Sequence, residues 1–340
     1  MVEDSKMKRR VPAEWELQEQ VWLSWPHQQE TWPGHYEPIP AFYLRWIDSL
    51  RESTSVKLLA GDPIIGDCEN QIQGRSGVDV IRIETNDCWI RDYGPTFVQT
   101  DSPNPLMGVD WKYNSWGGKY PPWEADNLVA SGICSELDIP CTQSQLCVEG
   151  GAMEFDGLGR MLSTSSCLLS PNRNPDWSRI QIEEEMERLL GIHEIMWLDG
   201  GGLCGDDTDG HIDQLARFID PENVVVATTD DRCDANYPAL DLNFRLMQAW
   251  GEETSPRVTI HRLPTPPARF VDGKRVPESY CNFLRLGSER LLVPSFGASS
   301  DEYARALLTE LTNITVEMID CRDMVWGLGA LHCASRDQPA

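Results

Sequence analysis

Five segments with helical periodicity recur along the chain, separated by groups of short strand-like runs. The last four start at intervals of roughly 50 to 60 residues, although no sequence motif repeats between them. This repeat of architecture without a repeat of sequence predicts an α/β fold built as a ring of modules around a shared centre. An ordinary α/β sandwich with irregular spacing remains the alternative. The helical segments are Ile39–Leu50, Glu124–Leu137, Trp177–Leu190, Ala239–Trp250 and Asp301–Leu311.

No stretch of the chain has the composition of an interdomain linker. We therefore expect residues 1–340 to form a single domain, with residues 1–10 as a loose N-terminal tail. Asp176 and Ser300 are expected to cap the starts of two helices. The predicted strands are Val21–Trp25, Val56–Ala60, Val80–Ile83, Thr96–Thr100, Gly108–Trp111, Met161–Leu169, Ile195–Leu198, Val224–Thr228, Arg257–Leu263, Tyr280–Leu286, Arg290–Val293 and Thr315–Ile319.

Charge and cysteine usage limit the environment and the partners of the chain. The 340 residues carry a formal net charge of −25, which argues against binding to nucleic acid or to an anionic membrane surface. The N-terminal segment lacks the apolar core of a signal peptide, and no apolar run is long enough to cross a membrane. The eleven cysteines form no C-x-x-C pair, which is typical of reduced thiols. We expect a cytoplasmic protein.

The segment Gly205–Asp213, with the sequence GDDTDGHID, places four carboxylates close to His211. An apolar run from Ile212 to Ile219 follows, and its alternation suits a strand. On such a strand the two-residue spacing would place the side chains of His211 and Asp213 on one face. A histidine beside a carboxylate can transfer protons and hold a cation, whereas a solvated acidic loop is the simpler alternative.

Cofactor motifs in the same region are incomplete. Gly200–Gly205 matches G-x-G-x-x-G, but aspartates follow it directly and would repel phosphate. A calcium loop counted from Asp207 lacks the glycine at its sixth position and the glutamate at its twelfth. Zinc binding by Cys204, His211 and Asp213 would lack a conventional ligand set. These motifs therefore indicate neither a nucleotide site nor a metal site.

The segment Asn86–Pro95 is densely polar although it lies between two strand-like runs, which suggests the lip of a pocket. Asp87 and Asp92 are its available carboxylates, and Trp89 could form an apolar wall. The alternative is a turn that contains an internal ion pair of Arg91.

Two further segments offer reactive groups. Glu149 ends a strand and precedes two glycines, although an isolated glutamate there is usually a solvated turn residue. Cys333 follows a glycine-rich run near the C-terminus and suits an exposed nucleophile, although most lone cysteines are buried apolar residues.

Carboxylates, a histidine and a cysteine together suit attack by a thiolate on a planar cation such as a guanidinium. Two aspartates would hold the cation, Cys333 would attack its central carbon, and His211 would move the protons.

Several short motifs are spread over nearly the whole chain. They are Pro12–Trp15, Trp25–His27, Trp89–Thr96, Asn114–Gly118, Glu149–Gly151, Asn172–Pro175, Gly205–Asp213 and Leu331–Cys333. Through these motifs the chain resembles the agmatine deiminase and Porphyromonas-type peptidylarginine deiminase family, within the guanidino-group-modifying (pentein) superfamily. The resemblance implies a five-bladed α/β propeller of ββαβ modules around a central active site. It also implies no metal or organic cofactor and a homo-oligomeric assembly.

The resemblance assigns roles that agree with the reading of the residues. Asp92 is preferred over Asp87 because it occupies the aspartate position of the W-x-R-D motif. The chain departs from the family at Asp209, where asparagine is common, and at the variable positions before the nucleophile. The implied site residues are Cys333 as nucleophile, His211 as general acid and base, Asp92 and Asp213 as guanidinium ligands, Glu149 as a partner of His211, and Trp89 as a wall of the substrate channel.

The expected reaction is the hydrolysis of agmatine, a small cationic guanidino compound, to N-carbamoylputrescine and ammonia. The same chemistry on free arginine or peptidylarginine is the first alternative, and amidino transfer or non-catalytic binding of cations is the second. An arginine-directed site would need a basic residue to meet the substrate carboxylate. The candidates for that residue are Arg91, Lys112 and Lys119.

Overall fold

The computed structural model describes residues 8–103 and 105–340. In this part of the chain the strands form five sheets of three or four strands and one separate hairpin. Each of the five sheets contains both parallel and antiparallel neighbours. The predicted α/β class is therefore confirmed. The strands are β1 (Arg9–Arg10), β2 (Gln18–Ser24), β3 (Ser55–Leu59), β4 (Val78–Ile81), β5 (Thr96–Thr100), β6 (Leu106–Lys112), β7 (Cys141–Cys147), β8 (Glu154–Phe155), β9 (Arg160–Thr164), β10 (Glu194–Leu198), β11 (Ala216–Asp220), β12 (Asn223–Thr228), β13 (Thr259–Pro264), β14 (Phe270–Val271), β15 (Lys274–Arg275), β16 (Leu284–Leu286), β17 (Arg290–Ser295), β18 (Thr315–Asp320) and β19 (Ser335–Pro339).

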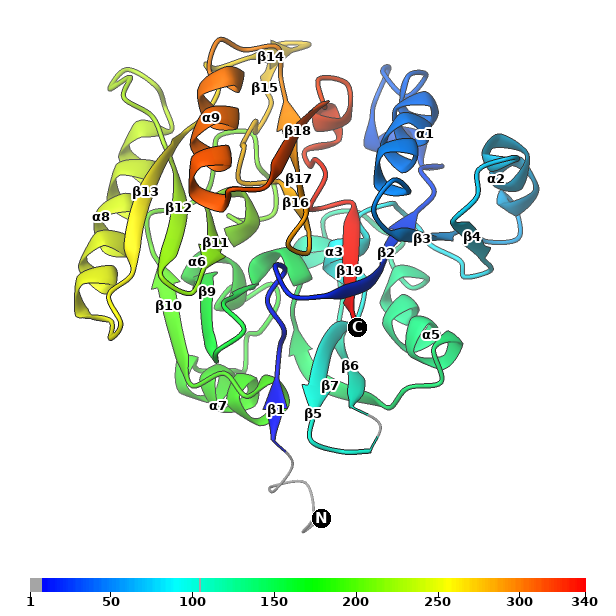
Figure 1. The fold of residues 1–340 in the computed structure, drawn as a ribbon, viewed down its shortest axis with the longest axis horizontal. Coiled ribbons are helices and arrows are strands. Elements are labelled where there is room, and N and C mark those ends of the chain that lie inside the picture. The colour runs from blue at the N-terminus through cyan, green and yellow to red at the C-terminus, as the bar shows by residue number, and fades with distance from the viewer. Residues whose placement is uncertain (1–7, 104) are drawn as a thin grey trace.

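The five sheets have the strand orders β19-β2-β3-β4, β1-β5-β6-β7, β10-β9-β8, β11-β12-β13 and β16-β17-β18, and the hairpin is β14-β15. The longer helices lie at the periphery, while the strands point toward the middle of the molecule (Figure 1). The helices are α1 (Ile39–Leu50), α2 (Ile65–Ile72), α3 (Ile90–Tyr93), α4 (Ser115–Gly118), α5 (Val129–Glu136), α6 (Ser165–Leu168), α7 (Arg179–Leu190), α8 (Tyr237–Glu253) and α9 (Asp301–Thr312).

Helix α7 starts two residues later than predicted because its cap is Ser178 and not Asp176. The Ser178 hydroxyl accepts a hydrogen bond from the amide of Gln181, and the Gln181 side chain accepts one from the amide of Ser178. This reciprocal pair satisfies two amides that the first turn of a helix leaves unpaired. Gly191 ends the helix in the left-handed conformation, with φ of 72°.

The largest departure from the predicted elements lies at the acidic segment. Residues Ile212–Gln214 form a 3₁₀ turn, η4, and strand β11 starts only at Ala216, so the predicted strand over Ile212–Ile219 is wrong in its first half. The carboxylate of Asp206 accepts hydrogen bonds from the amides of Thr208 and Gly210. These bonds fold the segment into a compact loop, and the chain enters the sheet after it.

Other departures shorten a predicted strand or add an element. The run Met161–Leu169 is strand β9 followed by the short helix α6. Residues Ser335–Pro339, which are not among the predicted strands, form strand β19, which pairs antiparallel with β2. Strand β19, near the C-terminus, therefore lies beside β2, from the N-terminal part of the chain, near the middle of the view in Figure 1.

Residues 1–7 of the predicted loose tail lie outside the described residues. Arg9 and Arg10 form β1, which pairs with β5, so the prediction of a loose tail is wrong for these two residues. No helix in the described part of the chain is long and apolar enough to cross a membrane.

Candidate active site

The residues predicted from separate segments converge around the backbone of Gly151. A β-carbon added to Gly151 would lie 2.6 Å from His211 Nδ1, 2.7 Å from Asp92 Oδ1 and 3.1 Å from Asp213 Oδ2. Asp92 belongs to α3, His211 and Asp213 flank the first residue of η4, and Gly151 follows β7. His211 and Asp213 therefore meet at a 3₁₀ turn, and not through the alternation of a strand.

Asp92 is a buried carboxylate with two hydrogen-bond donors. The amide of Gly151 donates to Oδ1 and the indole Nε1 of Trp116 donates to Oδ2, both at 2.9 Å. Burial, followed by the charges of Asp213 and Glu149, raises the pKa of Asp92 to about 6, although His211 and Trp116 oppose the rise. Trp116 was not predicted as a site residue, although it lies inside one of the resemblance motifs.

The backbone that presents Trp116 is unusual. Four consecutive residues, Ser115 to Gly118, have φ between 52° and 87°, so the short element α4 is a left-handed turn. The left-handed conformation costs a non-glycine residue about 1–2 kcal/mol. Asn114 supports the turn through a hydrogen bond from the Gly117 amide to its side chain. Strain of this kind is typical of functional sites, and here it points the indole N–H at Asp92.

His211 is fully buried, and neither of its ring nitrogens has a hydrogen-bond partner among the described residues. Nδ1 lies 3.6 Å from Asp92 Oδ1, and Nε2 lies 3.8 Å from Glu149 Oε2. Burial disfavours the cation, but Asp92, Cys167 and Glu149 outweigh it and raise the pKa of His211 well above its usual value. The imidazole is therefore a proton donor at neutral pH, set between two carboxylates.

Glu149 is held in its charged form by an arginine that the sequence did not assign to the site. Arg173 Nε lies 2.7 Å and 2.8 Å from the two carboxylate oxygens. Although burial opposes ionisation, Arg173 and His211 lower the pKa of Glu149 to about 2. Glu149, Cys167 and His211 offer ligand atoms within 4.8 Å of one another, but Arg173 already holds both oxygens of Glu149, so an ion pair describes this cluster better than a metal site.

The two carboxylate oxygens of Asp213 have different surroundings. Oδ2 lies 2.7 Å from His332 Nδ1 and 3.5 Å from the sulfur of Cys333, while Oδ1 is buried and has no partner among the described residues. Burial opposes ionisation, but the hydrogen bond from His332, together with the charges of His211 and Arg217, lowers the pKa of Asp213. Asp213 is therefore a carboxylate with one oxygen left for a ligand.

Cys333 lies in the loop before β19, with its sulfur beside Asp213. Asn282 Nδ2 lies 2.9 Å from the sulfur, and Asn282 Oδ1 accepts the amides of Ala330 and His332, so this asparagine fixes the loop. Burial, then Asp213 and Asp92, raise the pKa of the Cys333 thiol well above its usual value. A cation that neutralises the two aspartates would remove part of this penalty on the thiolate. Sequence reasoning missed Asn282 because it comes from a distant segment without a motif.

An open cavity of about 860 Å³ leads to this group, and Asp92, Trp89 and Cys333 line it. Gly329 packs closely between Trp89 and Cys333, since a β-carbon on it would be 2.5 Å from the Trp89 ring and 3.0 Å from Cys333 Cβ. Asp87 also lines the cavity, but Thr31 and the Cys88 amide donate to its carboxylate. The structure therefore brings all six predicted site residues together, whereas the carboxylate of Asp87 is bound by Thr31 and the Cys88 amide.

The three basic candidates for a carboxylate-binding group differ in position. Arg91 points away from the cavity, toward Asp337. Lys112 is exposed and does not line the cavity. Lys119 lines it, but its amine contacts the carbonyl of Asp207 and lies 2.9 Å from Asp209 Oδ1.

Comparisons with known proteins identify the family of the chain. A sequence profile of the Porphyromonas-type peptidyl-arginine deiminase family matches residues 10–339. An agmatine deiminase of Pseudomonas aeruginosa is 32% identical over 97% of this chain and 95% of its own length. A C. jejuni agmatine deiminase solved with substrate bound has a TM-score of 0.90 at 29% identity, covering 98% of this chain and 97% of that one. The agmatine deiminase of Enterococcus faecalis has a TM-score of 0.90 at 28% identity, covering 97% and 96%. The chain therefore belongs to the Porphyromonas-type peptidyl-arginine deiminase family.

Proposed function

We propose that this protein is an agmatine deiminase, which hydrolyses agmatine to N-carbamoylputrescine and ammonia through a covalent intermediate on Cys333. The observation that carries the proposal is the convergence of Asp92, Asp213 and His211 beside the Cys333 sulfur, with Asp213 Oδ1 and both nitrogens of His211 unpartnered among the described residues. The relatives from Pseudomonas aeruginosa, C. jejuni and Enterococcus faecalis named above support the choice of agmatine.

The first step is binding of the guanidinium between two buried carboxylates. Asp92 and Asp213 each offer an oxygen to the forked N–H donors, which fixes the plane of the cation next to the Cys333 sulfur. The positive charge favours loss of the thiol proton to solvent, so the substrate helps to create its own nucleophile.

The second step forms a C–S bond and releases ammonia. The Cys333 thiolate attacks the central carbon, and the former C=N bond gives its electron pair to nitrogen. The His211 imidazolium then protonates one terminal amino group, which leaves as ammonia when its C–N bond breaks. The product on the enzyme is an S-alkylthiouronium, and His211 is left neutral beside Glu149.

The third step hydrolyses the thiouronium. Neutral His211 removes a proton from water while the oxygen bonds to the central carbon. The tetrahedral adduct collapses to a urea as the C–S bond breaks, and the hydroxyl proton passes to the departing sulfur. His211 is again an imidazolium and Cys333 again a thiol, which restores the starting state.

The cavity favours a cationic far end of the substrate over a carboxylate. Lys119 lies in the cavity wall, but Asp209 pairs with its amine and offsets the charge that would attract the carboxylate of arginine. Asp87, Asp126 and Asp207 add acidic groups to the wall. We therefore rank free arginine and peptidylarginine below agmatine, and amidino transfer or non-catalytic binding below both.

The wider setting is also part of the proposal. We infer that the five mixed sheets are the blades of a five-bladed α/β propeller and that residues 1–340 form a single catalytic domain. Eleven cysteines, all free thiols, support a reducing, cytoplasmic location. The family resemblance favours a homo-oligomer.

Ammonia release tests the proposal with wild-type protein and Cys333→Ala on agmatine, arginine and a peptide ending in arginine. Turnover of agmatine that the variant abolishes is the expected result. Turnover of an arginine substrate instead would keep the mechanism and overturn the choice of agmatine. Absence of ammonia from all three substrates would refute the deiminase function.

A further inference from the structure

Asp92 and Asp213, the two carboxylates proposed to hold the guanidinium, form what we call the guanidinium clamp. A row of short hydrogen bonds runs from Asp213 into the protein, away from the substrate. Asp213 Oδ2 lies 2.7 Å from His332 Nδ1, and His332 Nε2 lies 2.6 Å from Glu14 Oε1. The other oxygen of Glu14 accepts from Arg217 at 2.6 Å. His332 is almost fully buried, and the proposed reaction steps use neither it nor Glu14.

The row ends at a second, smaller cavity on the other side of the catalytic wall. Asp92 lines the substrate cavity, while its neighbour Arg91 lines the second one. Cys333 also lines the substrate cavity, and the ring of its neighbour His332 contacts Glu14, which lines the second one. The second cavity has about 30 Å³, enough for one or two water molecules, so it is not a substrate site.

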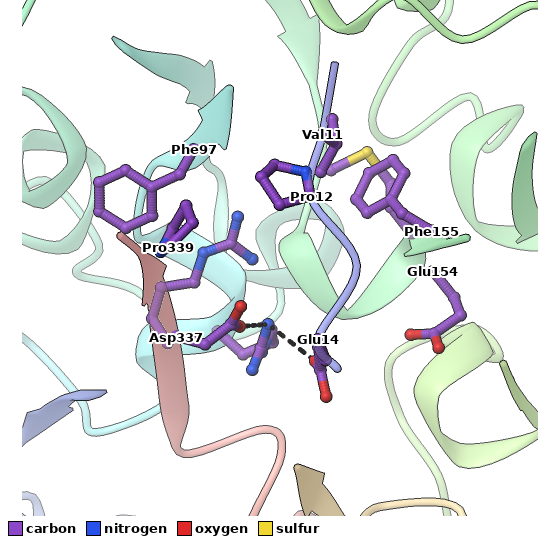
Figure 2. A pocket seen from close by; sticks show the side chains of 11 residues that line it. Val11, Pro12, Glu14, Phe97, Glu154, Phe155, Asp337 and Pro339 are labelled. Carbon is purple, nitrogen blue, oxygen red and sulfur yellow. Dashed lines mark hydrogen bonds and ion pairs between the residues drawn. The ribbon is translucent and has the colours of Figure 1, made fainter. Parts of the chain in front are cut away.

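Figure 2 shows Glu14 and Asp337 at the second cavity, where dashed lines mark their contacts with the guanidinium of Arg91. Arg91 also donates from Nε to the carbonyl of His332 at 3.2 Å, which fixes the backbone beside the nucleophile. The charged groups around the His332 ring thus come from different elements. They are Glu14 in the N-terminal segment, Arg91 in α3, Glu154 in β8, Asp213 in η4 and Arg217 in β11.

The contact with His332 determines which oxygen of Asp213 faces the substrate. A carboxylate can rotate about its bond to Cβ unless a donor fixes one of its oxygens. His332 Nδ1 fixes Oδ2, which also lies beside the Cys333 sulfur, so Oδ1 is the oxygen left without a partner in the described structure. Glu14 in turn fixes the ring, because it lies at hydrogen-bond distance from the other nitrogen.

We propose that His332 is a positioning residue that sets the rotation of the Asp213 carboxylate, with Glu14 as the anchor of its ring. The proposal rests on the proposed function, in which Asp213 is one arm of the guanidinium clamp. Without the donor at Nδ1 the carboxylate turns, and its oxygens no longer match the fork of the guanidinium. A misplacement of about 1 Å in such a geometry costs on the order of 100-fold in rate.

The test compares the alkylation of Cys333 by a haloacetamidine and by the corresponding haloacetamide, measured as adduct mass over time. The amidine is a cation with forked N–H donors that the clamp can hold, whereas the amide is neutral. The ratio of the two alkylation rate constants measures how well the clamp holds a forked cation. The measurement needs no catalytic turnover, and a general change in thiol reactivity affects both rate constants and cancels in the ratio. The variants are His332→Leu, His332→Asn, Glu14→Ala and, as a matched control in the second cavity, Asp337→Asn.

In His332→Leu the preference for the amidine is expected to fall at least about tenfold, with the amide rate changed by less than about threefold. His332→Asn should recover part of the preference, because its side-chain amide can again donate near the position of Nδ1. Asp337→Asn should retain the wild-type ratio. It removes a charge beside Arg91 in the second cavity, but it leaves the hydrogen bonds between Asp213, His332 and Glu14 in place.

An unchanged ratio in folded His332→Leu would overturn the proposal. If circular dichroism shows that His332→Leu is unfolded, Glu14→Ala is used in its place, because it keeps His332 and removes only the carboxylate that anchors the ring. An unchanged ratio in Glu14→Ala would also overturn the proposal. A wild-type protein without any preference for the amidine would refute the clamp itself, and with it the proposed function. The two failures are therefore distinguishable.

Discussion

Gly151 shows at the scale of one residue how closely the catalytic groups approach the backbone. A methyl group there would lie 2.6 Å from His211 Nδ1 and 2.7 Å from Asp92 Oδ1, both below van der Waals contact. We expect Gly151→Ala to lower kcat/KM for agmatine by about 100-fold or more, because the histidine and the clamp must move apart. Steady-state ammonia release measures the effect.

Gly66→Ala is the matched control for this change. Gly66 lies in α2, where an added β-carbon meets nothing within 4 Å. Alanine in a helix restricts the unfolded chain, so this variant should keep wild-type kinetics and gain about 0.5–1 kcal/mol in unfolding free energy. If Gly151→Ala also kept wild-type kinetics, His211 and Asp92 would not be catalytic groups in the observed arrangement.

The pKa of Asp92 predicts the acid limb of the pH profile. With a pKa of about 6 in the free enzyme, Asp92 becomes protonated as the pH falls below 6, and kcat/KM for a cationic substrate should fall with it. Trp116→Phe removes a hydrogen bond that favours the charged form. The pKa of Asp92 should therefore rise, and the acid limb should move by about one unit toward higher pH.

Trp111→Phe is the matched control for the pH profile. Its indole N–H donates to Thr96 at 2.9 Å in a buried contact outside the site. This variant loses a comparable hydrogen bond but should leave the acid limb in place. An acid limb that moves equally in both variants, or in neither, would contradict the role of Trp116.

At the scale of single elements, two residues are possible caps for the N-terminus of helix α7. The sequence suggested Asp176, whereas Ser178 makes the reciprocal bonds with Gln181. Ser178→Ala should cost about 1 kcal/mol in unfolding free energy, measured by urea denaturation, and Asp176→Ala should cost much less. Neither should change kcat. A larger loss in Asp176→Ala would mean that the helix starts earlier than described.

The elements also show what the sequence could and could not reveal. Helix α1 and strand β5 have the predicted bounds, because hydrophobic periodicity is a local property that the chain carries within each segment. The 3₁₀ turn at Ile212–Gln214 was missed, since the hydrogen bonds of Asp206 outweigh the alternation of the apolar run. Local side-chain bonds of this kind compete with sheet formation and leave no periodic signal.

Some site residues could likewise be predicted from the sequence, and others could not. Cys333, His211 and the carboxylates were predictable because reactive residue types stand out in short motifs. Asn282 and Glu14 were not, because their partners lie 51 and 318 residues away and only the fold brings them together. Glu14 lies inside the motif Pro12–Trp15, but glutamate and asparagine are common on protein surfaces, so the residue type alone marked neither as part of the site.

At the scale of the whole molecule, a net charge of −25 creates a field that attracts cations. Agmatine carries two positive charges, so kcat/KM should fall several-fold when the ionic strength rises from about 0.01 M to about 0.15 M, over which the Debye length shortens from about 30 Å to about 8 Å. The chemical step is buried and much less screened, so kcat should change little. A salt effect on kcat as large as that on kcat/KM would contradict long-range attraction as its cause.

Trapping the covalent intermediate is the most direct test of the central claim. Agmatine turnover would be stopped with acid within a single turnover, and the digested protein would be mapped by mass spectrometry. The account predicts an adduct on Cys333 with the mass of agmatine minus ammonia, absent from Cys333→Ala and unlabelled by ¹⁸O from the solvent water. An adduct on another residue, or ammonia released in a single turnover without any adduct on Cys333, would contradict it.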